Sequence, residues 1–517
     1  MMSVVLATVE PVTDKTTTVA ATSDVQESGI ARPIDGLGAG AAPARDTSRR
    51  DKRVIALLLS ATFVVILNET IMSVAIPKLM DDLHIDALAA QWLSTAFMLT
   101  MAVVIPITGF LLQRFTTRAV FIAAMSLFSS GTLLAALAPG FGVLVAARVV
   151  QASGTAIMLP LLMTTLMTLV PPASRGRTMG NVSIVISVAP AIGPTISGII
   201  LNYLSWRWMF LIVLPIALVM LLIGIRFVEN VTVTRKVKID VVSVILSALG
   251  FGGLLYGLSQ VGAGGSAAAS TALWVAVGVG AVALAAFIVR QLLLQRRDRA
   301  LLDLRTFSSR TFTISATVLG IGMIALFGTL IVLPIYLQNV HGLDPLSTGL
   351  LLLPGGLVQG LLSPVVGRLF DKHGPTVLLV PGTILVSAVL WFMSTVSEAT
   401  PIPMILGAHV ALSIGLALMF TPLFTSGLGS LPSNLYSHGS AIVGTVQQLA
   451  GAAGTAVFIT VMTLATTAAA RGGVVDVAAT GAGVRAAFLV GAIISVFAVV
   501  GAFFVRRPAQ DAPPVAH

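Results

Sequence analysis

This chain lacks cysteine and has few charged residues. It has 517 residues with no cysteine and only 10% charged residues, whereas soluble domains carry about 25% charged residues. The absence of cysteine excludes disulfides and thiolate metal sites, and the six histidines form no i, i+4 pair of the kind that binds zinc, so we expect no metal. Low charge, 56% hydrophobic residues and a mean hydropathy of +1.00 together exclude an ordinary soluble fold. These properties predict an all-α integral membrane protein.

Long apolar runs recur along the whole sequence. A helix needs about 20 mostly apolar residues to cross a bilayer, and fourteen segments reach that length. An even number of spans places both ends of the chain on the same side of the membrane. We therefore predict transmembrane helices at 54–76, 90–112, 118–138, 142–169, 179–202, 207–227, 240–261, 272–294, 312–338, 346–369, 376–396, 402–426, 439–466 and 485–505.

The net charge of +10 lies in the connections between the apolar runs rather than in one patch, so we expect no nucleic-acid partner. Cytoplasmic loops collect Lys and Arg. One set of alternate connections, which includes both ends of the helical region, holds most of these residues, and the other set holds only Lys78, Arg207, Arg471 and Arg485. This asymmetry predicts a multi-pass protein of the cytoplasmic membrane with both termini in the cytoplasm. Residues 1–50 carry no signal peptide and are predicted to be a disordered cytoplasmic tail.

An internal repeat divides the helices. The loop Gly109–Arg118 follows the second helix, and the similar loop Gly367–Gly374 follows the tenth, eight helices later, on the same side. Such spacing is typical of parallel repeats related by an axis along the membrane normal. We predict a six plus two plus six architecture: a six-helix bundle at 51–230, an inserted helix pair at 231–305 peripheral to the transport path, a second bundle at 306–507 and a short cytoplasmic tail at 508–517.

Few ionisable residues interrupt the apolar runs. Each costs about 2.5–3.5 kcal/mol inside a membrane, so those that remain face a cavity or a partner. Glu69 follows Asn68 in the first helix, and spacing of three places Arg148, Gln151 and Gly154 nearly on one face of the fourth. A carboxylate in a cavity that opens to each side in turn can load and release a proton, so Glu69 and Arg148 are candidates for proton coupling. Structural roles stay open: Glu69 can anchor its helix, and Arg148 can tie helices together through backbone carbonyls.

The fifth predicted helix contains two prolines four residues apart among small residues. Proline removes a backbone donor and bends a helix, and glycine lets neighbouring helices approach closely. The segment is therefore a candidate gating hinge, with simple close packing as the alternative. The residues in question are Pro190, Gly193, Pro194 and Gly198.

These segments together resemble the signature motifs of the major facilitator superfamily, in particular its fourteen-helix drug:proton antiporter branch. The similar stretches are Leu67–Pro77 in the first helix, Arg148–Gly154 in the fourth, Pro190–Gly198 in the fifth, Trp206–Phe210 at the entry to the sixth, and the two repeated loops. The pair Asn68–Glu69 with Gln113–Phe115 further resembles lincomycin-resistance exporters. The resemblance implies the major facilitator fold and the loop residues that latch the two halves in the outward-facing state: Gly109, Arg114, Arg118, Gly367, Arg368 and Asp371.

Two positions depart from the pattern of that branch. Asn68 stands where the first-helix acid is usual, and the carboxylate comes one residue later at Glu69, which turns the side chain by about 100°. The first loop has Gln113 in place of its usual acid, whereas the second retains Asp371. We therefore expect a displaced proton carrier and a weaker latch in the amino-terminal half.

A substrate cavity is expected between the two halves, where apolar, aromatic and amide groups can hold amphipathic compounds. Tyr336 and Gln338 also suit an alternative role as anchors at the membrane interface. The candidate cavity residues are Asn68, Gln91, Trp92, Gln151, Gln338, Gln359, Gln447 and Gln448.

The leading functional hypothesis is a proton-coupled multidrug exporter that works by alternating access, with lincomycin-type substrates. An exporter or symporter of a metabolite or amino acid is the alternative. A membrane enzyme or sensor would need a catalytic constellation or an output domain, and neither is visible in the sequence. The phosphate-binding loop that ATP-driven pumping would require is also missing from it. We expect no cofactor beyond the proton gradient as energy source, small amphipathic molecules and the lipid bilayer as partners, and a functional monomer.

Overall fold

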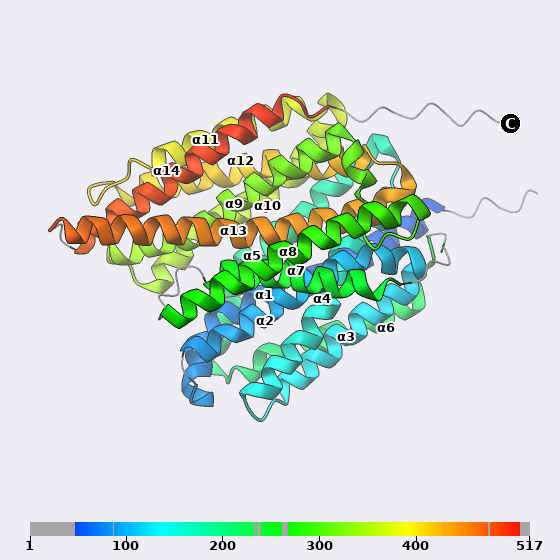
Figure 1. Ribbon diagram of the computed structural model, residues 1–517, viewed down its shortest axis with the longest axis horizontal. Coiled ribbons are helices and arrows are strands. Elements are labelled where there is room, and N and C mark those ends of the chain that lie inside the picture. The colour runs from blue at the N-terminus through cyan, green and yellow to red at the C-terminus, as the bar shows by residue number, and fades with distance from the viewer. Residues whose placement is uncertain are drawn as a thin grey trace, which may run out of the picture. The chain divides into compact units, whose positions relative to one another are not determined.

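The computed structural model describes residues 47–85, 87–231, 234, 239–260, 267–473 and 476–506, and its long elements are all α-helices (Figure 1). Fourteen helices in these ranges are long and apolar enough to cross a membrane. The chain divides into two units, Met1–Thr47 and Ser48–His517, and the membrane spans found in the described ranges lie in the second. The all-α membrane class and the fourteen spans are thus confirmed. The tails predicted at 1–50 and 508–517 lie almost wholly outside the described residues.

The helices begin and end close to the predicted segments, and several are longer. Apolar length alone sets the prediction, whereas polar and small residues at the ends of several apolar runs also adopt helical conformation. The early start of the last helix illustrates this: it begins at Asp476 rather than at 485. The bounds are α1 Thr47–Leu83, α2 Ala87–Arg114, α3 Thr117–Ala136, α4 Phe141–Leu169, α5 Arg175–Tyr203, α6 Arg207–Phe227, α7 Val241–Gln260, α8 Ala267–Leu294, α9 Arg310–Asn339, α10 Pro345–His373, α11 Thr376–Met393, α12 Ile402–Gly429, α13 Tyr436–Arg471 and α14 Asp476–Ala502.

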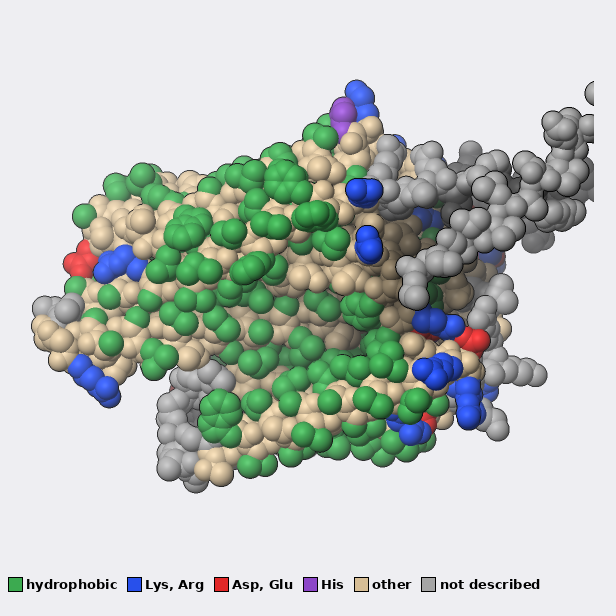
Figure 2. Space-filling model, turned by 45° about the horizontal axis from the view of Figure 1, so that its top comes forward, with side chains coloured by type: hydrophobic (Ala, Val, Ile, Leu, Met, Phe, Trp, Pro, Cys, Tyr) green, Lys and Arg blue, Asp and Glu red, His purple; other side chains and the backbone are tan. Residues whose placement is uncertain are grey.

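The two ends of the helical bundle differ. We call the end at which α1 begins and α14 ends the terminal end; the connections α2–α3, α4–α5, α6–α7, α8–α9, α10–α11 and α12–α13 also lie there. Figure 2 shows apolar side chains over much of the visible face, with most of the visible Lys and Arg side chains gathered towards one end. This distribution fits a body that faces lipid along its length.

Helices from the two predicted halves pack directly on each other. The most extensive contact is between α5 and α10, and α2 packs against α13; α4 against α13 and α5 against α12 add to the same seam. Figure 1 shows α5 and α10 in the middle of the helical region. The seam therefore joins the α1–α6 and α9–α14 segments, while their division into separate domains remains a prediction.

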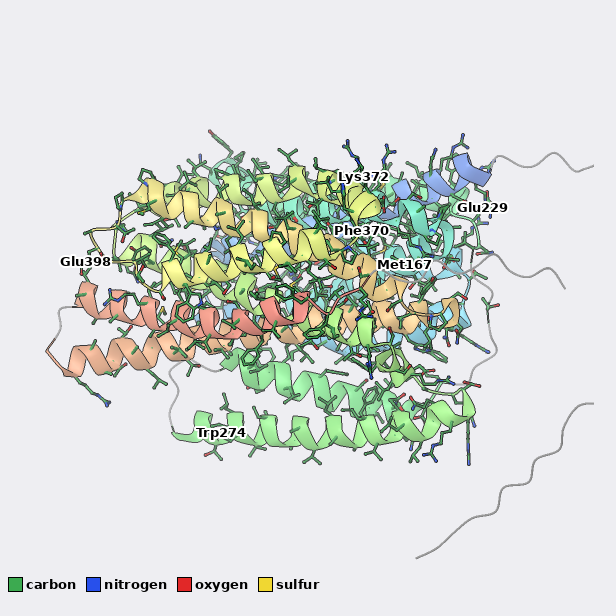
Figure 3. All side chains as sticks on the ribbon, turned by 90° about the horizontal axis from the view of Figure 1, so that it is seen from above. Met167, Glu229, Trp274, Phe370, Lys372 and Glu398 are labelled. Carbon is green, nitrogen blue, oxygen red and sulfur yellow. The ribbon has the colours of Figure 1, made fainter. Side chains whose placement is uncertain are left out.

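The pair α7 and α8 packs mainly on itself, and α7 also contacts α2 and α13. Figure 3 shows the pair along one edge of the bundle, with Trp274 of α8 at its outer side. Phe251 and Phe287 meet edge to face with ring centres 5.9 Å apart, and Gly253 of α7 lies against the backbone of Gly280 in α8. Small residues thus let the two helices approach closely.

A polar anchor holds this pair at the terminal end. Arg290 donates from Nε and Nη2 to the two carboxylate oxygens of Asp240, at 2.6 and 2.7 Å. These hydrogen bonds from Arg290 lower the pKa of Asp240 to about 2. Gln291 accepts hydrogen bonds from the backbone N–H groups of Leu301 and Leu302 and donates to Ser243, which links α8 to the segment before α9.

Candidate functional site: a polar centre and a latch at the terminal end

The predicted fourth-helix motif forms a buried polar network. Arg148 Nη1 donates to Gln151 Oε1 at 2.6 Å, and Gln151 Nε2 donates to Thr132 Oγ1 of α3 at 2.8 Å. The guanidinium carbon of Arg148 lies 4.1 Å from the centre of the Phe97 ring in α2, a cation–π arrangement that favours a desolvated cation. Gly154 lies against the Ala124 carbonyl of α3, so a side chain there is excluded. The network ties α2, α3 and α4 together around a buried positive charge.

Glu69 lies within electrostatic reach of this cation. Each of Glu69 and Arg148 is the charged group that acts on the other. Within the described ranges Glu69 has no hydrogen bond and no ion pair shorter than 4 Å, and its side chain is partly exposed. Its neighbour Asn68 is buried, and the Oδ1 atom of Asn68 has no hydrogen-bond partner among the described residues. Glu69 thus interacts with a buried cation without a direct ion pair, and its role in proton coupling remains a prediction.

The proline-containing segment of α5 packs against α1 next to Glu69. The helix continues through Pro190 and Pro194 without interruption. Gly193 faces Thr70, and a side chain at Gly193 would collide with the Thr70 hydroxyl. Gly198 has open space around it. Close approach of α5 to the Glu69-bearing part of α1 therefore needs Gly193, whereas the hinge role of this segment remains a prediction.

A charged contact joins the two halves at the terminal end. Asp371 of α10 accepts hydrogen bonds from the backbone N–H groups of Gly176, at 2.7 Å, and Arg177, at 2.8 Å, in the first turn of α5. A carboxylate suits this place because the first N–H groups of a helix have no partner within the helix and carry partial positive charge. Gly176 and Gly367 pack backbone to backbone beside it.

The corresponding contact from the first loop is weaker in kind. Gln113 Nε2 donates to the Asn434 carbonyl at 3.3 Å, a single bond between neutral groups. Gly109 faces His438 of α13, and Arg118 Nη2 donates to the Ile225 carbonyl of α6 at 2.6 Å. The two loops thus differ in their partners, and the weaker latch expected in the amino-terminal half remains a prediction. Arg114 and Arg368 are exposed.

Several further contacts in this seam were not predicted from the sequence. Arg175 donates to the Tyr436 hydroxyl at 3.2 Å, and the buried Ser183 and Thr421 hydroxyls are 2.9 Å apart. Gly180 lies against the Ser363 carbonyl. Only their partners in the other half reveal these residues, because hydroxyl and glycine residues are common in all the helices.

Contact between α5 and α10 stops short of the opposite end. It reaches Gly356, which lies against Ala191. Beyond that, Gly349 and Gly198 have no heavy atom within 4 Å of an added side chain, and Tyr203 at the end of α5 is 79% exposed. The structure is therefore packed shut along this seam at the terminal end and looser at the opposite end.

The predicted cavity residues occupy different environments. Trp92 stacks on Tyr256 of α7, with ring centres 5.8 Å apart, so its ring faces the inserted pair. Gln151 belongs to the buried network of Arg148. Gln448 Nε2 lies 3.7 Å from the sulfur of Met101 across the seam, and the Oε1 atom of its neighbour Gln447 is buried without a partner in the described part of the chain.

The remaining amides are spread over other helices. Gln359 is buried in α10, and Gln338 is partly exposed near the end of α9. Its neighbour Tyr336 is buried and donates to the Ser397 carbonyl at 2.7 Å, which ties α9 to the α11–α12 connection. The side chain of Gln91 lies outside the described residues. Asn68, Gln359, Gln447 and Gln448 thus stay the better candidates for ligand contact, and that role remains a prediction.

The model of the Major Facilitator Superfamily matches residues 58–455. The chain belongs to this superfamily. It is a multi-pass membrane transporter, a secondary transporter rather than an enzyme, and the predicted family is confirmed.

Sequence similarity to known proteins extends over nearly the whole chain. It is 40% identical over 460 residues to the lincomycin resistance protein LmrB of Bacillus subtilis strain 168, covering 88% of this chain and 95% of that relative. It is 41% identical over 461 residues to the uncharacterized MFS-type transporter YcnB of the same organism, covering 89% and 96%.

Solved structures show the same fold at low sequence identity. The human organic anion transporter MFSD10 superposes with a TM-score of 0.64 at 13% identity, over 87% of this chain and 99% of that one. The proton:xylose symporter XylE gives 0.60 at 15% identity, over 89% and 96%. At these identities the superpositions establish the fold alone.

Proposed function

We propose that this transporter exports small amphipathic antibiotics, with lincomycin as the first compound to test, in exchange for protons. One observation supports the proton-coupling part of the proposal. Glu69 interacts electrostatically with the buried Arg148 but has no hydrogen bond or ion pair in the described ranges. The choice of substrate rests on the relatives named for lincomycin resistance.

The energy source in this proposal is the proton gradient, with no further cofactor. Glu69 takes up a proton while the cavity is open to the outside and releases it to the cytoplasm after the bundle has switched. Each proton that moves down the membrane potential supplies about 2.3 kcal/mol per 100 mV, which corresponds to roughly a fortyfold gradient of exported compound.

In this proposal the protein lies in a bacterial-type cell membrane, and its terminal end faces the cytoplasm. The Lys and Arg residues of the connections gather at that end, as cytoplasmic loops do. The seam closed by Asp371 then seals the cytoplasmic side, so the described conformation faces outward. The expected partners are amphipathic small molecules and the lipid bilayer, without nucleic acid, and a monomer suffices because both halves lie in one chain.

The test expresses the chain in a host that lacks its own drug pumps. Resistance and efflux are measured for lincomycin and a panel of antibiotics, amino acids and metabolites, with and without a protonophore. We expect efflux of an amphipathic antibiotic that stops when the protonophore is added. Efflux that continues undiminished refutes proton coupling, and efflux confined to amino acids or metabolites refutes the drug-export function.

Three variants locate the coupling group. Glu69→Gln keeps the shape and removes the charge, so we expect normal membrane abundance and loss of active efflux. Arg148→Ala is expected to lose efflux as well, because it removes the cation that acts on Glu69. Glu398→Gln is the matched control: this carboxylate is exposed in the α11–α12 connection. Normal efflux by a well-expressed Glu69→Gln variant shows that another group carries the proton.

A further inference from the structure

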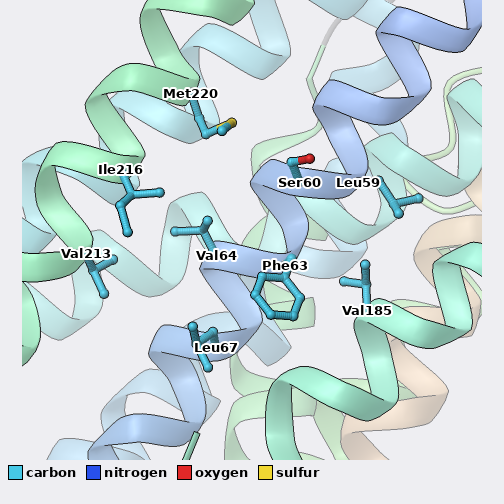
Figure 4. A pocket seen from close by; sticks show the side chains of 9 residues that line it. All are labelled: Leu59, Ser60, Phe63, Val64, Leu67, Val185, Val213, Ile216 and Met220. Atoms are coloured by element: carbon cyan, nitrogen blue, oxygen red, sulfur yellow. The ribbon is translucent and has the colours of Figure 1, made fainter. Parts of the chain in front are cut away.

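A cavity of about 350 Å³ lies between α1, α5 and α6, all helices of the amino-terminal half (Figure 4). On α1 its wall is formed by Leu59, Ser60, Phe63, Val64 and Leu67. Ser60, Phe63 or Val64, and Leu67 recur every three or four positions and so form one stripe along the helix. Ser60 is exposed and Phe63 partly exposed, so this stripe of α1 opens to the surroundings of the bundle.

The facing walls come from two other helices. Val213, Ile216 and Met220 of α6 point towards α1, and Val185 of α5 closes the other side (Figure 4). Ile216 is 43% exposed. In a multi-pass membrane protein, an apolar groove that opens between two membrane-length helices offers a place for lipid, and apart from the Ser60 hydroxyl the side chains on its walls are apolar.

Basic residues continue the same stripe of α1 towards the terminal end. Arg53, Ala56 and Ser60 lie three and four positions apart, which places them on one face. The rise of an α-helix puts Arg53 about 10 Å beyond Ser60 along the axis. Arg53, its neighbour Lys52 and the intervening Ala56 are exposed, so the apolar groove leads past a small side chain to a pair of cations.

Among the described residues, the nearby acids do not neutralise that end of the groove. Asp51 lies on the opposite face of α1 from Ser60, since nine residues turn the helix by about 900°. Glu229, just beyond α6, pairs with Arg50 at 2.8 Å and so bridges α1 and α6 at the head of the groove. Arg226 adds a further exposed cation on α6, 5.7 Å from the ring of Phe227.

We propose that this groove binds one anionic phospholipid, with an acyl chain along α1 between α5 and α6 and the phosphate beside Lys52 and Arg53. The apolar length with cations at one end matches a lipid of the adjoining leaflet, because acyl chains bury apolar area and phosphates attract clustered basic residues. Leu67 lines the groove two residues before Glu69, so the lipid contacts the membrane side of the same helical turn that carries the coupling group. The binding site itself does not depend on which compound is exported.

The binding test uses the purified full chain and a photoactivatable phosphatidylglycerol, with photoactivatable phosphatidylcholine in parallel. Peptide mapping of the cross-links locates the acyl chain, and competition by unlabelled lipid measures affinity. We expect labelling of α1 and α6 around Ser60 and Ile216, stronger with phosphatidylglycerol. Each basic residue near a membrane surface changes affinity for anionic lipid about fivefold. Lys52→Gln/Arg53→Gln is therefore expected to weaken the binding of phosphatidylglycerol about 25-fold and to leave the binding of phosphatidylcholine nearly unchanged.

Separate variants test the apolar groove and the basic residues at its end. Ser60→Trp fills the groove and is expected to abolish labelling by both lipids, whereas Leu222→Trp, at an exposed position of α6 outside the groove, is the matched control. Arg296→Gln/Arg297→Gln is the charge control, because these exposed residues lie at the same end beside α8. Labelling spread evenly over the membrane face, or labelling that neither variant at the groove changes, overturns the proposal. Displacement of the lipid probe by exported antibiotic at equal concentration would instead identify the groove as a substrate entry and also refute it.

Discussion

Asp371→Asn should open the seam at the terminal end. The carboxylate of Asp371 receives two backbone hydrogen bonds from the first turn of α5, and hydrogen bonds to a charged group contribute about 1.5–3 kcal/mol each. Asparagine keeps one acceptor oxygen, but its amide NH₂ meets the second N–H group, so one bond is lost and the remaining one becomes neutral. We expect the closed arrangement at this end to lose about 2–4 kcal/mol, which lowers its population relative to the open one by roughly 30- to 800-fold.

The absence of native cysteine makes this shift directly measurable. Spin labels at Phe115→Cys and Val377→Cys report the terminal end of the two halves, and labels at Tyr203→Cys and Leu346→Cys report the opposite end; all four native side chains are exposed. In Asp371→Asn we expect the distance between the labels at 115 and 377 to lengthen and the distance between the labels at 203 and 346 to shorten.

The control for this experiment removes a carboxylate that does not join the halves. Asp298→Asn lies at the same end, where its side chain is 70% exposed and pairs with Arg305. Its label distances should match those of the parent chain. Unchanged distances in Asp371→Asn would show that apolar packing of α5 on α10, and not the Asp371 contact, holds the seam closed.

Three further perturbations test other parts of the structure. Gly367→Ala forces a methyl group against the backbone of α5, and overpacking of about 1–3 kcal/mol should open the same seam in the spin-label assay; an unaltered seam refutes the close-packing argument. Gln151→Leu leaves Arg148 without its 2.6 Å acceptor and should lower thermal stability by about 1.5–3 kcal/mol, and a thermal midpoint equal to that of the parent would refute the network. Asp240→Asn should cost about 2 kcal/mol at pH 7 because Arg290 holds the folded pKa of Asp240 near 2; the contribution is present above pH 4 and is lost as pH falls towards 2, so the difference between variant and parent should disappear there and not at pH 5–7.

The positions of the helices followed from the sequence because a bilayer demands about 20 apolar residues wherever a helix crosses. The ends did not follow as well. Arg485 was predicted to begin the last span, but it lies inside α14, and its Nη1 atom donates to the Val396 carbonyl at 3.3 Å. A partner far away in sequence satisfies this cation within the helix, and apolar length alone gives no sign of such a partner.

For the candidate site, the sequence predicted some of the residues in each contact but not their partners. Helical spacing correctly places Arg148 beside Gln151, but Phe97 and Thr132, which complete the network, come from two other helices. Repeated loop residues drew attention to Asp371, yet its partners are backbone N–H groups, which every residue except proline possesses. Tertiary packing chooses among such partners, so a sequence pattern can name one side of a contact and not the other.

The most direct test of the account is proton movement in response to the exported compound. The purified chain is placed in liposomes that enclose a pH-sensitive dye, and lincomycin or the best compound from the panel is added without an imposed gradient. Exchange predicts a substrate-triggered pH change that requires Glu69 and is absent in Glu69→Gln, while Glu398→Gln behaves as the parent. Compound transport without any pH change, or the same pH change in Glu69→Gln, would contradict proton coupling through this carboxylate.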